Sequence, residues 1–330
     1  MSGNHGAPRI ALLGIGGTIA MTGGGSAGVT PALDADTLRA ALPGIEAIAR
    51  VEAVDVASMP SPHMGLDTLI SVRRAILDAR ARGCRGAVVS QGTDTIDESA
   101  FGLQLVHDWD LPVVVTGAMR HPAQPGADGP ANLLDALRVA ATPAHRGVLV
   151  VLNATIHAPE RVAKRHTTRP DAFVSTGGRL GGVAESRVFL EPDRSPPGLG
   201  AAAACQAPAP VALLTAAMGD DGRLLDGLPE RGYRGLVIDA MGGGHLPPAM
   251  ATRLAGLPDE FPVVIASRTG GGCTLRETYG YAGGEIDLAR RGVIRAGSLT
   301  GLKARVALSL LLGAGLEGPD IRAFFEAFGG

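Results

Sequence analysis

Short apolar runs rich in β-branched residues alternate with helical patterns through the first half of this 330-residue chain. The expected strands are 10–13, 51–56, 86–90, 112–116 and 147–152, and the expected helices are 67–81 and 131–141. Strands that are apolar on both faces and alternate with helices predict a parallel sheet covered by helices, an α/β fold. Ligands bind such sheets beyond the carboxyl ends of the strands, so we expect the functional site in the loops that follow the strands.

A segment without periodicity, residues 191–210, interrupts this alternation and contains five prolines. Strand and helix patterns resume after it. The expected strands are 211–214, 235–239 and 262–266, and the expected helices are 299–312 and 320–328. We therefore predict a large N-terminal parallel-sheet domain over 1–190, a linker over 191–210 and a smaller C-terminal α/β domain over 211–330.

Composition excludes several classes of partner. The net charge is only −2 and aromatic residues make up 3% of the chain, whereas nucleic-acid binding calls for a basic surface or stacking rings. No uninterrupted apolar run approaches the roughly 18 residues of a membrane span. The N-terminus shows no signal-peptide pattern, so we expect a cytoplasmic protein with no nucleic-acid or membrane partner.

Metal and disulfide chemistry have no sequence signal. Cys84, Cys205 and Cys273 are far apart, odd in number and outside any CxxC pattern. The eight histidines show no HExxH or HxH spacing. The sequence predicts no metal site and no disulfide framework.

The first expected strand runs into a glycine-rich turn, 14–20, with the sequence GIGGTIA. The simplest interpretation is a tight strand-to-helix turn in which glycines supply positive φ. A dinucleotide fingerprint would need Gly or Ala where Ile19 stands. Thr18 favours a catalytic interpretation, because its hydroxyl directly follows glycines whose backbone N–H groups are open to an oxyanion.

Polar residues also follow the later strands. Thr95 and Glu98 fit a capping box, which leaves Thr93 and Asp94 without a helix-start role, although a solvated turn also explains Asp94. Asp128 after the fourth strand is explained by a chain turn. Lys164 lies in a basic segment that is either solvated or aims an ammonium into a pocket, where it would lower the cost of deprotonating a hydroxyl.

Several segments, taken in order and spacing, resemble the bacterial-type L-asparaginase/glutaminase family, which uses a threonine nucleophile. These segments are 16–20, 91–95, 117–120, 128–132, Lys164 and the C-terminal stretch 292–305. The resemblance implies two α/β domains, a homotetramer assembled as a pair of dimers, and no metal or organic cofactor. The implied reaction hydrolyses the side-chain amide of a small amino-acid substrate to the acid and ammonia.

The resemblance also implies roles for individual residues. Thr18 would be the nucleophile that forms an acyl-enzyme, and Thr93, Asp94 and Lys164 would form a second group that activates a hydroxyl or water. Asp94 would also hold the substrate α-ammonium, and Ser61 its α-carboxylate. The implied substrate-binding set is Ser61, Gly92, Thr93, Asp94, Ala118 and His245.

Physical chemistry is consistent with these roles. A threonine hydroxyl is a poor nucleophile at neutral pH and needs a base or a nearby positive charge. Pairing of Lys164 with Asp94 would supply that charge in a water-poor cleft. Thr93 and the amides of the glycine turn would stabilise the tetrahedral oxyanion.

The chain departs from the family pattern at three positions. Pro62 stands where the family usually has Gln or Glu, so one ligand of the substrate amino group is missing. Val29 stands where the family often has a Tyr that hydrogen-bonds the nucleophile, and no Tyr precedes Tyr233. His245 replaces the Asn of the family's Gly-x-Gly-Asn, an amide that reaches a neighbouring subunit's site.

Both threonine motifs and Lys164 favour an L-asparaginase. The departures at Pro62 and Val29 keep open an amidohydrolase acting on L-glutamine, a β-aspartyl compound or a peptide-linked Asn. An amidotransferase component acting on aminoacyl-tRNA is disfavoured, because we see no extra N-terminal domain and no basic surface. A non-catalytic amino-acid-binding member is disfavoured by the presence of all four expected catalytic residues.

Overall fold

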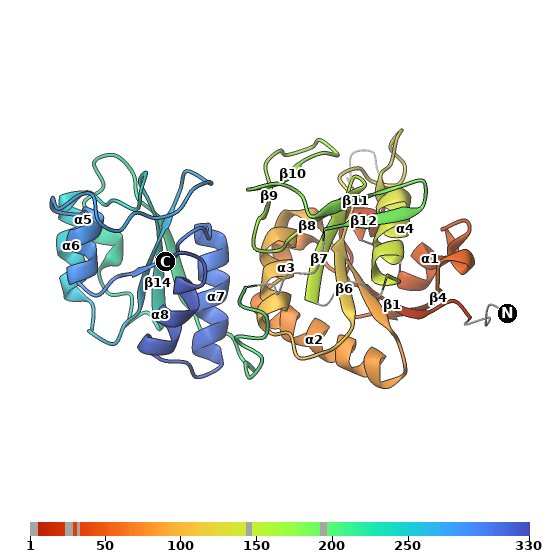
Figure 1. The fold of residues 1–330 in the computed structure, drawn as a ribbon, viewed down its shortest axis with the longest axis horizontal. Coiled ribbons are helices and arrows are strands. Elements are labelled where there is room, and N and C mark those ends of the chain that lie inside the picture. Colours follow the sequence, from red (N-terminus) through yellow and green to blue (C-terminus); the bar gives the residue numbers. More distant parts are fainter. Residues whose placement is uncertain (1–5, 24–28, 32–33, 143–146, 192–196) are drawn as a thin grey trace. The chain divides into compact units, whose positions relative to one another are not determined.

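The computed structural model describes residues 6–23, 29–31, 34–142, 147–191 and 197–330 (Figure 1). The chain divides into two compact units, Met1–Pro196 and Pro197–Gly330. The predicted linker, 191–210, begins in the first unit and ends in the second.

The first unit is built on an eight-stranded sheet with the order β12-β11-β8-β7-β6-β5-β1-β4. Its strands are β1 (Arg9–Gly14), β4 (Arg50–Asp55), β5 (Gly86–Ser90), β6 (Pro112–Thr116), β7 (Gly147–Leu152), β8 (Thr155–His157), β11 (Gly181–Ala184) and β12 (Arg187–Leu190). The run from β4 to β7 is parallel, whereas β8, β11 and β12 continue the sheet in antiparallel fashion. The parallel sheet predicted from the sequence is confirmed, with an antiparallel edge that was not predicted.

Helices cover both faces of this sheet (Figure 1). They are α1 (Ala35–Ala40), α2 (Leu66–Ala81), α3 (Ile96–Leu105) and α4 (Gly129–Ala140). Alternate strand residues such as Ile10, Leu12 and Val88 form one core with α1 and α4. Helices α2 and α3 pack against each other and against β1, β5 and β7. The buried strands read as continuous apolar runs because both of their faces are covered.

The loops of the first unit contain short 3-10 helices and short strands. The 3-10 helices are η1 (Thr18–Ala20), η3 (Ile45–Ala47), η4 (Ser61–His63) and η5 (Thr93–Thr95). Two hairpins stand apart from the main sheet, β2 (Met21–Gly23) with β3 (Val29–Pro31) and β9 (Val162–Lys164) with β10 (Phe173–Ser175). Residues 24–28, between β2 and β3, lie outside the described residues.

The second unit has a parallel sheet with the order β13-β14-β15-β16. Its strands are β13 (Val211–Thr215), β14 (Gly235–Ala240), β15 (Val263–Ser267) and β16 (Ile294–Arg295). Its helices are η6 (Arg223–Leu225), α5 (Pro248–Arg253), η7 (Leu254–Gly256), α6 (Glu285–Arg290), α7 (Gly301–Gly313) and α8 (Gly318–Glu326). Helix α7 packs on β13, β14 and β15 and is buried over most of its length, as its apolar sequence predicts.

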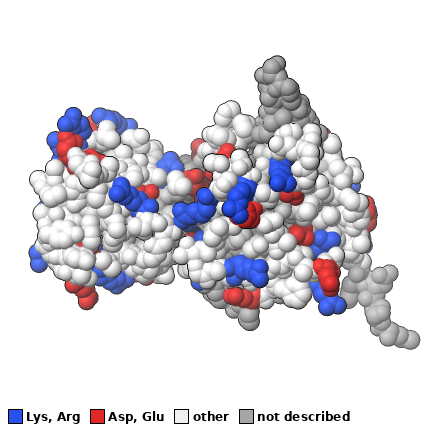
Figure 2. Space-filling model, turned by 90° about the horizontal axis from the view of Figure 1, so that it is seen from above, with Lys and Arg blue, Asp and Glu red and all other residues white. Residues whose placement is uncertain are grey.

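None of the helices in the described parts of the chain is long and apolar enough to cross a bilayer. On the face seen in Figure 2, basic and acidic side chains are interspersed among uncharged ones.

Candidate active site

Three loops that follow neighbouring parallel strands carry most of the predicted site residues. Thr18 begins η1 shortly after β1, Thr93 and Asp94 lie in η5 after β5, and Ala118 follows β6. Strands β1, β5 and β6 are adjacent in the sheet, so their carboxyl ends lie side by side. This is the edge at which open α/β sheets bind ligands.

Glycines bring the first two loops into backbone contact. A Cβ at Gly17 would lie 2.1 Å from the backbone nitrogen of Gly92, and Gly17 has a φ of +83°. A Cβ at Gly92 would lie 2.7 Å from the Ser61 Oγ. Only glycine allows both approaches. The turn that carries Thr18 is therefore held directly against the loop that carries Thr93 and Asp94.

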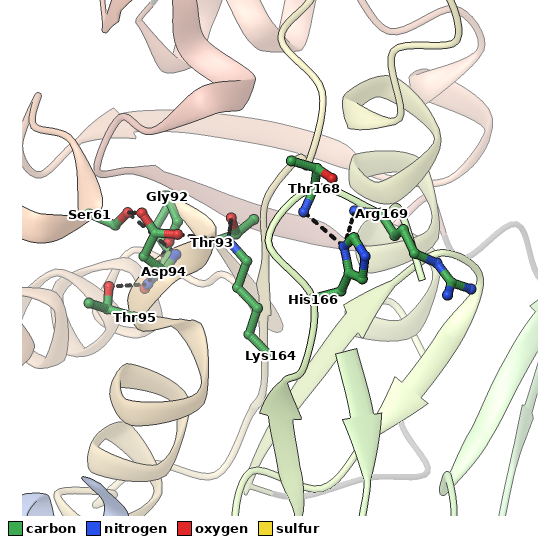
Figure 3. Close-up of polar contacts among 10 residues, drawn as sticks. Ser61, Gly92, Thr93, Asp94, Thr95, Lys164, His166, Thr168 and Arg169 are labelled. Atoms are coloured by element: carbon green, nitrogen blue, oxygen red, sulfur yellow. Dashed lines mark hydrogen bonds and ion pairs between the residues drawn. The ribbon is translucent and has the colours of Figure 1, made fainter. Parts of the chain in front are cut away.

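Lys164 connects two of the predicted catalytic residues (Figure 3). Its Nζ donates hydrogen bonds to Thr93 Oγ1 at 2.9 Å and to Asp94 Oδ1 at 2.7 Å. The Lys164 side chain is 16% exposed, whereas that of Asp94 is 58% exposed. The positive charge is thus mostly shielded, and the carboxylate opens towards solvent, where it can meet a charged ligand group.

The second oxygen of Asp94 is held by Ser61. Ser61 Oγ donates to Asp94 Oδ2 at 3.1 Å, and the backbone N–H of Asp94 donates to Ser61 Oγ at 3.4 Å. The hydrogen bond from Lys164 outweighs partial burial and lowers the pKa of Asp94. Asp94 is therefore an anion at neutral pH, and the structure places Ser61, Thr93, Asp94 and Lys164 in one hydrogen-bonded cluster.

The loop after β6 is supported by Asp128 and Asn132 rather than by a simple turn. The Asp128 carboxylate accepts from the backbone N–H groups of Met119 at 3.0 Å and Arg120 at 2.9 Å. The buried Asn132 amide donates to Gly117 O at 2.9 Å and to Asp128 Oδ2 at 3.1 Å. Three of these bonds hold the backbone that flanks Ala118, and the fourth joins Asn132 to Asp128, so the two side chains shape this wall of the site.

Helix α3 begins as predicted, but the proposed capping role of Thr95 is wrong. Thr95 makes no side-chain capping bond, since the chain already forms the 3-10 turn η5 before α3 begins. The Thr95 hydroxyl instead accepts from Gln91 Nε2 at 3.4 Å and contacts Met64 Sδ at 3.5 Å. Thr95 supports the site loop rather than the helix end.

His166, two residues after Lys164, shapes the following turn and was not singled out from the sequence. Its Nδ1 accepts from the backbone N–H groups of Thr168 and Arg169, both at 3.1 Å (Figure 3). The basic segment around it gave no signal for this local contact, which depends on the turn conformation.

His245 lies in the second unit, after β14, in a cluster of its own. Its Nε2 is 3.1 Å from Glu285 Oε2, and its Nδ1 is 3.0 Å from the Tyr281 hydroxyl. Because a carboxylate only accepts, Nε2 donates to Glu285, and for the neutral ring Tyr281 then donates to Nδ1. Both ring nitrogens of His245, which is predicted to bind substrate, thus have hydrogen-bond partners within this unit.

No cluster of three or more metal-ligating side chains occurs in the described portion of the chain. The three cysteines are free, with Cys84 and Cys205 buried and Cys273 exposed. The side chains gathered around Asp94 are hydroxyls, a carboxylate and an ammonium, a set suited to acyl transfer with a hydroxyl nucleophile.

Family models match almost the whole chain. Residues 9–195 match the model "Asparaginase, N-terminal", and residues 210–325 match the "Glutaminase/Asparaginase C-terminal domain". The chain belongs to the bacterial-type asparaginase family and is a hydrolase that acts on amides.

Individual relatives agree with this assignment. A probable L-asparaginase of Deinococcus radiodurans is 38% identical over 96% of this chain and 97% of its own length. A crystal structure of a probable cytoplasmic L-asparaginase from Campylobacter jejuni has a TM-score of 0.86 at 29% identity, over 97% of this chain and 99% of that one. A glutamyl-tRNA(Gln) amidotransferase component from Methanosarcina acetivorans is 30% identical over 89% of this chain and 70% of its own length.

Proposed function

We propose that this chain is an L-asparaginase, which hydrolyses L-asparagine to L-aspartate and ammonia through an acyl-enzyme on Thr18. The observation that carries the proposal is the Ser61–Asp94–Lys164–Thr93 cluster, held by the Gly17–Gly92 contact beside the turn that bears Thr18. The named L-asparaginase relatives support the same substrate class.

Two steps account for the reaction. In the first, Thr18 Oγ loses its proton and attacks the amide carbon, the C–N bond breaks, and the amide nitrogen takes up a proton and leaves as ammonia. In the second, water attacks the ester carbon, the bond to Thr18 Oγ breaks, one water proton passes to Thr18 Oγ, and L-aspartate is released. The backbone N–H groups of the glycine turn would stabilise the oxyanion in both steps.

Thr93 and Lys164 are proposed to activate the attacking water. Lys164 donates to Thr93 Oγ1, so the Thr93 proton points away from the ammonium. A nearby positive charge also lowers the cost of negative charge on a hydroxyl oxygen. This arrangement suits a hydroxyl that takes part in proton transfer.

The same cluster is proposed to recognise the amino-acid end of the substrate. The ionised, solvent-facing Asp94 suits an α-ammonium, and the Ser61 hydroxyl suits an α-carboxylate. Gly92 and Ala118 would contribute backbone groups. The family resemblance assigns His245 to a neighbouring subunit's site, where a ligand of Nδ1 would replace the hydroxyl of the exposed Tyr281.

A panel of amides tests the substrate. Purified protein and Thr18→Ala are compared by ammonia release from L-Asn, L-Gln, D-Asn, a β-aspartyl compound and a peptide-linked Asn. We expect the largest kcat/KM for L-Asn and none above background for Thr18→Ala. Full activity of Thr18→Ala would contradict the mechanism, and the absence of ammonia from L-Asn would contradict the substrate.

A second candidate function is hydrolysis of another amide, L-glutamine above all. Pro62 favours it, because Pro62 directly follows Ser61 in η4 and carries no side-chain group that can bind an ammonium. A site built to hydrogen-bond a polar group discriminates strongly against analogues that lack it, so a missing ligand relaxes selectivity. The same panel decides, since a higher kcat/KM for L-Gln than for L-Asn would favour this candidate.

The oligomeric state and the cellular location are also proposals. We propose a cytoplasmic homotetramer built as a pair of dimers, in line with the family resemblance and with the Campylobacter jejuni relative described as cytoplasmic. Light scattering after size exclusion should give about four times the 33.5 kDa chain mass. A monomer that releases ammonia at full rate would contradict the assembly.

A further inference from the structure

His157, the last residue of β8, is a buried titratable side chain that the proposed mechanism does not use. It is 3% exposed, and its Nδ1 lies 2.8 Å from Ser175 Oγ. Burial lowers its pKa to about 4, so the imidazole is neutral at physiological pH. A polar ring in such a place is expected to satisfy its hydrogen bonds, and Ser175 provides one.

Ser175 belongs to the β9–β10 hairpin, which is a separate two-stranded sheet. Lys164 pairs with Phe173 at one end of the hairpin, and Val162 pairs with Ser175 at the other. Val162 and Phe173 are buried, whereas Val174 is 53% exposed. Because strand residues alternate between faces, Ser175 shares the inner face with Phe173, and Lys164 shares it with Val162.

The hairpin is attached to the rest of the unit at both ends. Two strands of three residues each are marginal on their own, so such a hairpin depends on outside contacts. At one end Lys164 binds Thr93 and Asp94, and at the other Ser175 binds His157 of the main sheet. The two attachments lie two residues apart along the strands, about 7 Å.

We propose that His157 is a positioning residue, which fixes the β9–β10 hairpin on the main sheet through Ser175 and so keeps Lys164 Nζ between Thr93 and Asp94. The inference rests on the catalytic role proposed for Lys164. Without the His157–Ser175 bond, β9 keeps its packing on α3 and its backbone bond from Val162 to Ala158, but β10 loses a side-chain bond to the main sheet, and the Lys164 ammonium shifts. A displacement of about 1 Å at a reacting group can cost roughly 100-fold in rate.

The test compares three variants in β10. Ser175→Ala removes the bond, Ser175→Thr keeps a hydroxyl, and Val174→Ala is a matched control on the exposed face. With the best amide of the panel, we expect kcat/KM of Ser175→Ala to fall roughly tenfold, less than a full 1 Å displacement would cost. We expect Ser175→Thr to retain most activity and Val174→Ala to match wild type.

The pH profile separates positioning from mere stability. Lys164 and Ser61 are the groups that bond the Asp94 carboxylate, and Lys164 lowers its pKa. In Ser175→Ala the acid limb of kcat/KM should therefore move to higher pH. A structural role alone would lower the melting temperature and leave this limb in place.

An unchanged kcat/KM and acid limb in Ser175→Ala, or the same change in Val174→Ala, would overturn the inference. Should Ser175→Ala fail to fold, His157→Asn decides, because its amide takes the place of Nδ1 and should preserve activity, whereas His157→Leu should lose it. Lys164→Met distinguishes a failure of the proposed function from a failure of the positioning role. Wild-type activity of Lys164→Met would contradict the proposed function. Loss of activity in Lys164→Met together with normal activity of Ser175→Ala would contradict only the positioning role.

Discussion

The two units each place a carboxylate cluster beyond the carboxyl ends of parallel strands, but the clusters differ in what holds the carboxylate. In the first unit, side chains from separate loops bind Asp94, which remains 58% exposed. In the second unit, the buried Glu285 accepts from the backbone N–H groups of Thr278 and Tyr279, both at 2.6 Å, and from His245.

The difference shows that a place at this edge of a parallel sheet does not by itself make a carboxylate available to a ligand. The fold dictates that polar residues gather at this edge of a parallel sheet. Glu285 Oε1 accepts from nearby backbone N–H groups and so fixes a loop. Burial raises the pKa of Glu285, but the hydrogen bonds from this backbone and from His245 lower it overall. Asp94 keeps a face open to solvent, so it can exchange contacts with a ligand, while the Glu285 carboxylate is committed to structure.

The largest expected effect comes from removing the hydroxyl beside the first cluster. Thr18→Ala should lower kcat/KM by about 1000-fold or more, because the proposed mechanism forms the acyl-enzyme on Thr18 alone. Steady-state ammonia release measures it. Thr142→Ala, a change of the same kind at the end of α4, is the control and should behave as wild type.

The next largest effect is expected from removal of the Lys164 ammonium. Lys164→Met should lower kcat by about 100-fold or more, since positioned proton-transfer groups contribute on this scale. The acid limb should also move to higher pH, because Asp94 loses the partner that lowers its pKa. Arg169→Met, which removes an exposed charge paired with Asp171, should change neither quantity.

His157 should make the stability of the first unit depend on pH. Its pKa falls from 6.5 to about 4 on folding because of burial, so between these values the unfolded chain binds a proton that the folded chain does not. Stability is therefore lost as the pH falls through this window, by about 3 kcal/mol in full. Urea unfolding at several pH values should show a flatter dependence for His157→Leu than for wild type.

A smaller effect is expected in the second cluster, and on stability rather than rate. Glu285→Gln should lower the free energy of unfolding by about 2 kcal/mol, because buried N–H groups lose a charged acceptor. The value of kcat should change by less than the Lys164→Met loss. If Glu285→Gln lost as much rate as Lys164→Met and kept its melting temperature, the structural role of Glu285 would be contradicted.

Much of the fold could be predicted because β1, β5, β6 and β7 are uninterrupted apolar runs. Strands β8, β11 and β12 could not, since each is short and their turns lack the usual glycines. Asn153 and Ala154 take φ values of 49° and 55° before β8, and Glu185 and Ser186 take 49° and 64° between β11 and β12. Among these four residues only Asn adopts positive φ readily, and neither pair contains the glycine of the Asn-Gly or Asp-Gly hairpin signal.

The site was predictable to the extent that its residues follow strands or match family motifs. Thr93 and Asp94 stood out because they directly follow a buried strand. Asn132 lies in the recognised segment 128–132, but its bond with the Asn153 backbone and the His157–Ser175 bond were not predictable, because they join segments distant in sequence and depend on the tertiary arrangement. Local patterns identify loops, and only the folded chain shows which side chains hold them.

A quenched reaction of Thr93→Ala with L-asparagine tests whether Thr18 carries the acyl group. This variant should form the ester faster than it hydrolyses it, because Thr93 is proposed to activate the water of the second step. We expect a burst of about one ammonia per chain and an aspartyl adduct on the peptide that contains Thr18. An adduct on another residue, or steady ammonia release with neither burst nor adduct, would contradict it.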